Sequence, residues 1–129
     1  MAAAWMARSG DPFSDRINSM AKYVVSSTLT DPQWANTTVI AGDPIAAIRR
    51  LKAQPGQDLV QYGFGQLSYA LLEHGLLDEL RLWVHPLFAG RASTEDLMFR
   101  PAAAAQLELA DTLVLNTGTV ILTYRVPVV

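Results

Sequence analysis

The sequence predicts an α/β fold whose mixed sheet ends in an antiparallel hairpin. Three observations support this class. Short apolar segments alternate with segments of helical periodicity along most of the chain. The apolar segment 59–62 leads through a glycine turn into a helix-periodic segment, in the order strand, turn, helix. Near the C-terminus, two alternating segments flank a glycine-containing turn at 116–119, which is typical of a β-hairpin.

The first elements are a short helix at 2–7 and a second helix that begins after Asp11. Asp11 has the side chain of an N-cap, and Pro12 suits the first helical position because it has no N–H to lose. The short continuous run of strand-forming residues at 23–25 predicts a strand covered on both faces. A polar loop follows, and the next strand is expected at 37–41.

The same capping pattern recurs at Gly42, Asp43 and Pro44, and it predicts a helix over residues 45–54. Asp43 is therefore an N-cap first and a ligand contact second. The inward stripe of this helix is expected at Ile45, Ile48, Leu51 and Lys52.

A strand at 59–62 and a helix at 65–74 follow, with Gly75 as the residue that ends the helix. Gly63 and Gly65 lie between them. Glycines allow positive φ and close approach of a ligand, and the first N–H groups of the helix have no intrahelical partner. This turn is therefore a physical candidate for holding a phosphate, although a tight turn without any ligand is the alternative.

The rest of the chain reads as β structure. A strand with two different faces is expected at 80–85, and a short pairing segment at 97–99. The terminal hairpin covers 107–115 and 120–125, and it carries one edge of the sheet.

The composition indicates a single globular domain over residues 1–129, with no internal boundary. Half of the 129 residues are hydrophobic and 17% are charged. A net charge of -2 gives no basic surface for nucleic acid, and no apolar run approaches a membrane span. The absence of cysteine excludes disulfides and a thiolate nucleophile. We expect a cytoplasmic, bacterial-type protein that binds neither nucleic acid nor membranes.

Other polar residues give little support for catalysis. Asp78 and Glu79 are adjacent, so their side chains diverge and cannot share a proton. His74 and His85 have no accompanying carboxylate motif, so we expect no metal site. Ser26 and Ser68 lie in neither a G-x-S-x-G elbow nor a triad signature, which argues against a hydrolase.

In order along the chain, several segments resemble the dihydrofolate-reductase-like family, in particular the reductase domain of bifunctional riboflavin-biosynthesis enzymes. The segments that carry the resemblance are KYVVSSTL at 22–29, WANTTVI at 34–40, YGFGQL at 62–67, GLLDELRL at 75–82 and PLFAG at 86–90. With the terminal hairpin, the resemblance covers nearly the whole chain.

The resemblance implies a three-layer fold with a mixed sheet, NADPH as the cofactor, and hydride transfer to a pterin-like or ribosylaminopyrimidine-like small molecule. The cofactor-binding residues that it implies are Ser26, Ser27 and Thr28 at the adenosine 2′-phosphate, Gly42 and Asp43 near the adenine, and Gly63, Phe64, Gly65, Gln66 and Leu67 at the pyrophosphate. It assigns no catalytic residue to this chain.

Ser27 leaves the choice of cofactor open. Family members often carry arginine at this position, which pairs with a 2′-phosphate through two hydrogen bonds. Serine supplies only a neutral hydroxyl, so NADH is an alternative to NADPH.

The resemblance also implies that the chain lacks the family's N-terminal part, which includes a central strand. The chain would then be a fragment, a mis-started product or a naturally shortened protein. A slot left in the sheet would expose apolar surface and unpaired backbone groups, so we expect a homo-oligomer, most simply a dimer. The alternative function is a non-catalytic nucleotide-binding or oligomerisation remnant of the fold.

Overall fold

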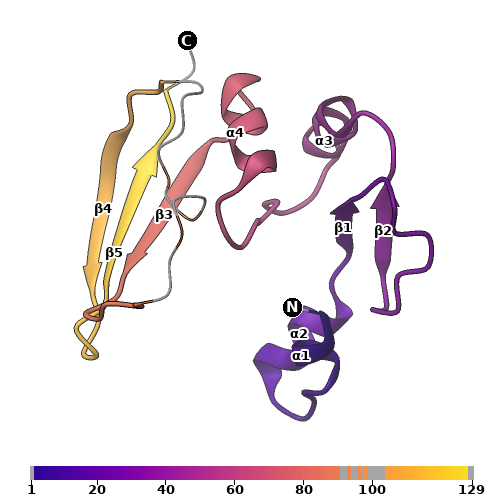
Figure 1. Ribbon diagram of the computed structural model, residues 1–129, viewed down its shortest axis with the longest axis horizontal. Helices are drawn as coiled ribbons and strands as arrows, with labels where there is room; N and C mark the ends of the chain where they lie inside the picture. The colour runs from indigo at the N-terminus through magenta and orange to yellow at the C-terminus, as the bar shows by residue number, and fades with distance from the viewer. Residues whose placement is uncertain (1, 91–92, 94–95, 97, 99–103, 128–129) are drawn as a thin grey trace. The chain divides into compact units, whose positions relative to one another are not determined.

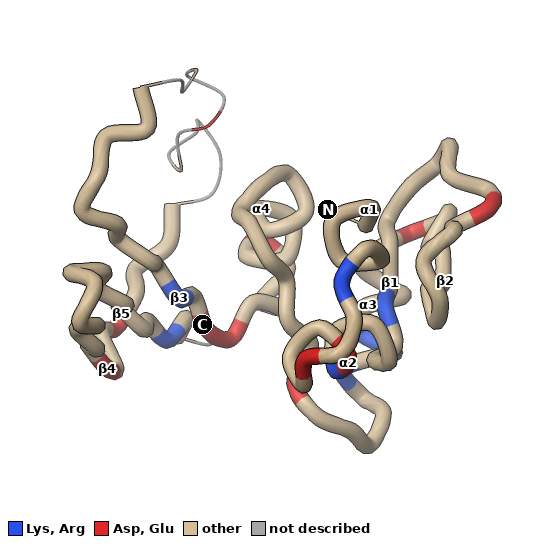
Figure 2. The backbone as a smooth tube through the Cα atoms, turned by 90° about the horizontal axis from the view of Figure 1, so that it is seen from below, with Lys and Arg blue, Asp and Glu red and all other residues tan. Residues whose placement is uncertain are grey.

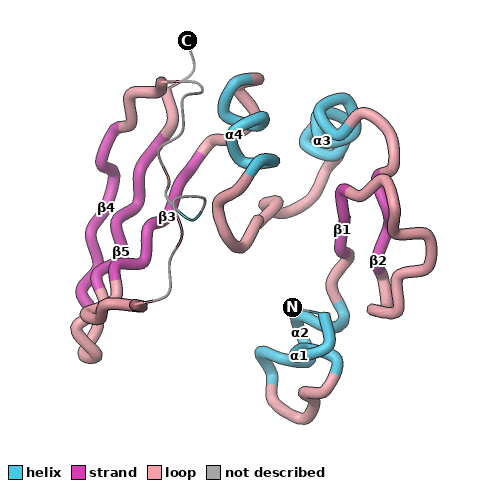
Figure 3. Tube along the Cα trace, in the orientation of Figure 1, coloured by secondary structure: helices cyan, strands magenta, loops and turns pink. Residues whose placement is uncertain are grey.

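The computed structural model describes residues 2–90, 93, 96, 98 and 104–127. The chain forms two compact units, Met1–Gln54 and Pro55–Val129, and each is described by itself. The mixed α/β class is confirmed, with a parallel strand pair in the first unit and an antiparallel sheet in the second (Figures 1 and 3). No helix among the described residues is long and apolar enough to cross a membrane.

The elements follow the order expected from the sequence, with one strand fewer. The helices are α1 (Ala2–Met6), α2 (Pro12–Ser19), α3 (Pro44–Lys52) and α4 (Gln66–Glu73). The strands are β1 (Lys22–Val25), β2 (Thr37–Ile40), β3 (Glu79–Val84), β4 (Glu108–Val114) and β5 (Val120–Arg125).

The start of α2 confirms Asp11 as its N-cap. The Asp11 carboxylate accepts a hydrogen bond from the Ser14 backbone N–H at 2.9 Å. Hydrogen bonds from Ser14, first from its side chain and then from its backbone, lower the pKa of Asp11. Asn18, on the same helix, holds α1 in place because its amide nitrogen donates to the carbonyls of Trp5 and Arg8 at 3.1 and 2.9 Å.

Lys22 ties the end of α2 to the beginning of β1. Its ammonium donates to the carbonyls of Ile17, Asn18 and Met20 at 3.2, 2.9 and 2.8 Å. It also lies 4.8 Å from the centre of the Trp34 ring, a cation–π geometry. Desolvation by burial lowers the pKa of Lys22. The ammonium therefore satisfies carbonyls that have no partner at a helix C-terminus.

Replacing Lys22 by methionine is expected to lower the free energy of unfolding of this unit by about 1–3 kcal/mol, because carbonyls at the end of α2 lose a charged donor. Urea unfolding measures the change. The control is Arg49→Met on the exposed side of α3, which should change stability by no more than about 0.5 kcal/mol. Equal effects of the two substitutions would contradict the bridging role of Lys22.

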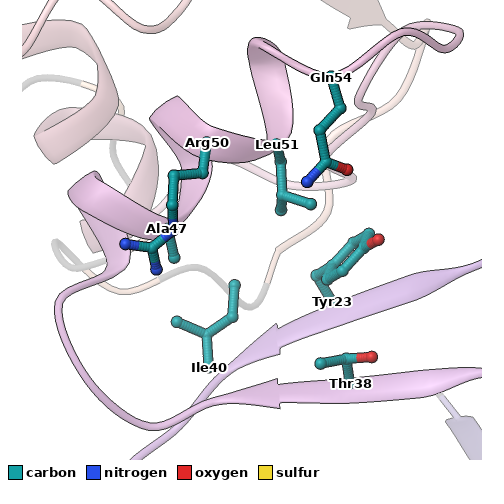
Figure 4. Close-up of a pocket in the computed structure, with 7 residues that line it drawn as sticks. All are labelled: Tyr23, Thr38, Ile40, Ala47, Arg50, Leu51 and Gln54. Atoms are coloured by element: carbon teal, nitrogen blue, oxygen red, sulfur yellow. The ribbon is translucent and has the colours of Figure 1, made fainter.

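β1 and β2 pair in parallel, but β1 is not covered on both faces as expected. Tyr23 is 44% exposed and Val25 39% exposed, whereas Lys22 and Val24 are half-buried. The reason is that α3 does not close onto the strands, and a shallow cavity of about 180 Å³ remains between them (Figure 4). The cavity is lined by Tyr23, Thr38, Ile40, Ala47, Arg50, Leu51 and Gln54.

The inward stripe of α3 is confirmed at Ile45, Ile48 and Leu51, which are half-buried, but not at Lys52, which is exposed. Lys52 directly follows Leu51, so it points about 100° further round the helix, and its charge favours solvent. Lys52 belongs instead to the basic last turn of α3, with Arg49 and Arg50. Elsewhere in the described residues, positive and negative side chains are interspersed along each unit (Figure 2).

The strand expected at 59–62 is absent, which corrects the sequence prediction. This segment pairs with no other strand among the described residues. Leu59, Val60 and Tyr62 are 50%, 70% and 65% exposed. An apolar, β-branched segment becomes a strand only when a neighbouring strand accepts and donates its backbone hydrogen bonds.

α4 ends as expected at Gly75, whose φ is +62°. The Gly75 N–H donates to the Leu72 carbonyl at 3.2 Å, and the Leu76 N–H donates to the Leu71 carbonyl at 2.8 Å. This pair of bonds is a Schellman motif, which satisfies carbonyls at the end of the helix. Leu71 is one of two buried hydrophobic residues among those described.

The second unit is completed by an antiparallel sheet in the order β3-β5-β4. The expected hairpin is confirmed, and its turn uses Gly118 at φ +82°. Within the described ladder, β4 is an edge strand, as predicted for the hairpin. The pairing segment expected at 97–99 lies mostly outside the described residues.

Candidate functional site

The first group of predicted site residues lies at the carboxyl ends of β1 and β2. Ser26 directly follows β1, and Gly42 and Asp43 follow β2. The strands run parallel, so these ends meet at one edge, and the Ser26 N–H donates to the Ile40 carbonyl at 3.2 Å. In α/β proteins, ligands bind beyond the carboxyl ends of parallel strands. The structure thus brings two of the three predicted contact regions together.

The side chain of Ser26 stabilises the turn formed by the residues that follow it. Its Oγ accepts hydrogen bonds from the N–H groups of Thr28 and Leu29 at 3.3 and 3.0 Å. Ser27 and Thr28 are exposed. The turn therefore presents the two neighbouring hydroxyls to solvent, while the oxygen of Ser26 is already engaged as an acceptor.

Asp43 has the capping role expected for it. One carboxylate oxygen accepts from the N–H groups of Ile45 and Ala46 at 2.9 and 3.2 Å. The preceding Gly42 has open space where a Cβ would be. The free N–H groups at this end of α3 thus already have a carboxylate as their acceptor. A negatively charged phosphate is therefore less suited to this position than an uncharged part of a ligand.

The second group of predicted site residues forms the glycine turn before α4, in the other unit. Gly63 has a φ of +88°, a backbone conformation that residues with a side chain rarely adopt, so this position favours glycine. Gly65 is the N-cap of α4, and a Cβ built on it would meet nothing within 4 Å. Phe64 packs edge-on against Tyr69, with ring centres 4.9 Å apart.

The amide groups at the start of α4 suit an anion. Gln66, Leu67 and Ser68 occupy the first three helical positions, whose N–H groups have no intrahelical acceptor. Gly65 has no side chain that could accept from them. These amides have no acceptor in the described part of the chain. Together with the positive end of the helix dipole and the open space at Gly65, they fit a phosphate group. This geometry is what a pyrophosphate-binding turn requires.

Ser68 is a residue of this turn that sequence reasoning passed over, because it was considered only as a nucleophile. Its side chain is 2% exposed, and its Oγ accepts from the Gly65 N–H at 3.1 Å. A serine three positions after a helix N-cap was the available signal, since this is the position that bonds back to the cap in a capping box.

Glu79, His85 and His74 have local partners or positions of their own. Glu79 pairs with Arg81 at 2.6 Å. His85 Nδ1 lies 3.3 Å from the hydroxyl of Thr119, which is in the turn of the hairpin. His74 is the C-cap of α4. Within the described part of the chain, no group of three or more acidic or histidine side chains could hold a metal ion.

Known proteins were compared with this chain by sequence and by structure. The sequence model of the RibD C-terminal domain matches residues 1–121, and so extends over both compact units. The uncharacterized protein YyaP of Bacillus subtilis (strain 168) is 29% identical over 110 residues, which are 84% of this chain and 56% of YyaP. The chain therefore spans little more than half of that relative.

The structural comparison gives the same fold. A crystal structure from Shewanella sp. PV-4, of a protein provisionally named for riboflavin biosynthesis, matches with a TM-score of 0.66 and 19% identity. The match covers 84% of this chain and 62% of the other. The α/β fold predicted from the sequence is confirmed, and at this identity the likeness concerns the fold alone.

Proposed function

The chain belongs to the family of RibD C-terminal domains, and on this premise we propose that it is an NADPH-dependent reductase. Its substrate would be a small molecule with a pterin-like or ribosylaminopyrimidine-like ring. The single observation that carries the proposal is the open glycine turn before α4, where Gly63 has a positive φ and Gly65 leaves room for a phosphate.

In this proposal the chain's residues bind and orient the cofactor. The amides of Gln66 and Leu67 would hold the pyrophosphate, and Gly42 would lie near the adenine. When bound, the nicotinamide supplies the hydride, so the protein needs few reactive side chains of its own. A proton donor is not part of the proposal.

The selectivity for the 2′-phosphate rests on neutral groups. The exposed hydroxyls of Ser27 and Thr28 can donate hydrogen bonds to a phosphate, but they bring no positive charge. We therefore expect the dissociation constants of NADPH and NADH to differ by no more than about tenfold. A tenfold ratio corresponds to a difference of about 1.4 kcal/mol in binding free energy.

A second candidate function is a non-catalytic nucleotide-binding or oligomerisation module. The observation that favours it is that the candidate residues are backbone amides and hydroxyls, at the start of α4 and in the Ser26 turn. Such groups can hold a nucleotide without catalysing a reaction.

The test of the reductase is NADPH oxidation, followed by absorbance, in the presence of a panel of pterins and ribosylaminopyrimidines. Turnover that requires one of these compounds would support the enzyme. The non-catalytic module would be favoured if the chain bound NADPH but oxidised it with none of these compounds, both alone and when mixed with a longer relative.

Two further expectations belong to the proposal. The protein would act in the cytoplasm, where NADPH is the reductant and a chain without cysteine needs no oxidising compartment. It would also act as a homo-oligomer, most simply a dimer.

A further inference from the structure

A buried hydroxyl connects the two ends of the glycine turn. Ser68 Oγ accepts from the Gly65 N–H at 3.1 Å and donates to Gln61 Oε1 at 3.2 Å. Ser68 is 2% exposed, whereas Gln61 is exposed. The hydroxyl thus joins the segment that enters the turn, the N-cap and the first turn of the helix.

This arrangement replaces the usual helix cap. A side chain at the N-cap normally accepts from the N–H groups of the first turn, but Gly65 has no side chain. The N3 side chain, Ser68, instead accepts from the N-cap N–H, which is one half of a capping box. The Gly65 N–H is therefore engaged, whereas the amides of Gln66 and Leu67 have no acceptor among the described residues.

We propose that Ser68 is a positioning residue of the nucleotide site, an inference that rests on the proposed function. By holding the Gly65 N–H and the Gln61 amide, Ser68 fixes the turn in the form that directs the Gln66 and Leu67 amides toward the pyrophosphate. Gly65 contributes space rather than a donor. Ser68 itself touches the turn and not the ligand.

The test is calorimetric titration of Ser68→Ala with NADPH, compared with the wild-type chain. We expect the dissociation constant to rise about tenfold, because the turn loses the bond that fixes it. Affinity for adenosine 2′-monophosphate, which lacks the pyrophosphate, should not change. In hydrogen exchange, the Gly65 amide should exchange faster in the variant, since its acceptor is gone.

Ser14→Ala is the matched control. Ser14 occupies the same third position of α2, and its side chain is also 2% exposed. The two variants should lose similar stability, so a loss of NADPH affinity in both would assign the effect to stability and overturn the positioning role.

Gln61→Ala provides an independent variant, because its exposed side chain can be removed without opening a core. It should weaken NADPH binding about twofold to threefold, since Ser68 keeps its bond to Gly65. If Ser68→Ala and Gln61→Ala both bind NADPH with the affinity of the wild-type chain, Ser68 has no positioning role and the proposed function stands. A folded wild-type chain that does not bind NADPH overturns both proposals.

Discussion

Replacing Gly65 by valine is expected to weaken NADPH binding at least about 100-fold, or about 2.7 kcal/mol, in a protein that still folds. Gly65 has φ -152° and ψ -160°, an extended conformation that other residues adopt. Apart from its chain neighbours, a Cβ at this position would meet no atom of the described residues within 4 Å. The added side chain would instead fill the space through which a phosphate must approach the amides of α4.

The control for this substitution is Gly56→Val. Gly56 also has open space where a Cβ would be, and its φ is not positive. Both variants should melt cooperatively near the wild-type temperature, and only Gly65→Val should lose NADPH in calorimetry. Unchanged affinity in a folded Gly65→Val protein would show that this turn does not hold a phosphate.

The protein is expected to have a mass in solution of at least twice the 14.1 kDa of one chain. Among the described residues, Ile17 and Leu71 are the buried hydrophobic side chains, fewer than a chain of this length needs for its core. Exposed apolar side chains are numerous in the second unit; they include Leu59, Val60, Tyr62, Trp83, Leu109, Leu113 and Val114. Apolar surface of this extent and unpaired strand edges favour association.

Multi-angle light scattering over a range of protein concentrations measures this mass. A sharp peak at 14.1 kDa at every concentration, from a protein that also melts cooperatively, would contradict the expected oligomer. A chain that is stable as a monomer would have to bury these side chains within itself.

Local signals predicted three of the helix caps correctly. Asp11 and Asp43 cap α2 and α3, and Gly75 ends α4 in a left-handed conformation, all as the sequence indicated. Caps depend on side chains within three or four residues of the helix end, so the sequence contains the information they need. The terminal hairpin was predictable for the same reason, because a short turn joins its strands.

Features that depend on distant partners were not predictable. Segment 59–62 has the composition of a strand, but a strand requires a neighbour that composition does not reveal. The bonds from Lys22 to the end of α2 and from Asn18 to α1 likewise depend on how elements meet. Lys52 was assigned to the inward stripe from helical spacing alone, and the structure leaves it exposed.

The candidate site was predicted in part. The sequence singled out the glycine turn and the Ser26 turn, and the structure adds that Ser26 Oγ is engaged with the backbone while Ser27 is exposed. The position of Ser68, third after the N-cap, indicates its bond to Gly65, whereas its bond to Gln61 depends on how the preceding segment meets the helix.

The decisive measurement is calorimetric titration of the wild-type chain with NADPH, with the mass determined in the same buffer. We expect saturable binding with a dissociation constant of about 1–100 µM, and binding of NADH within about tenfold of that value. A folded oligomer that gives no heat of binding with either nucleotide would contradict the proposed cofactor site. The fold would then serve as a scaffold without a cofactor site.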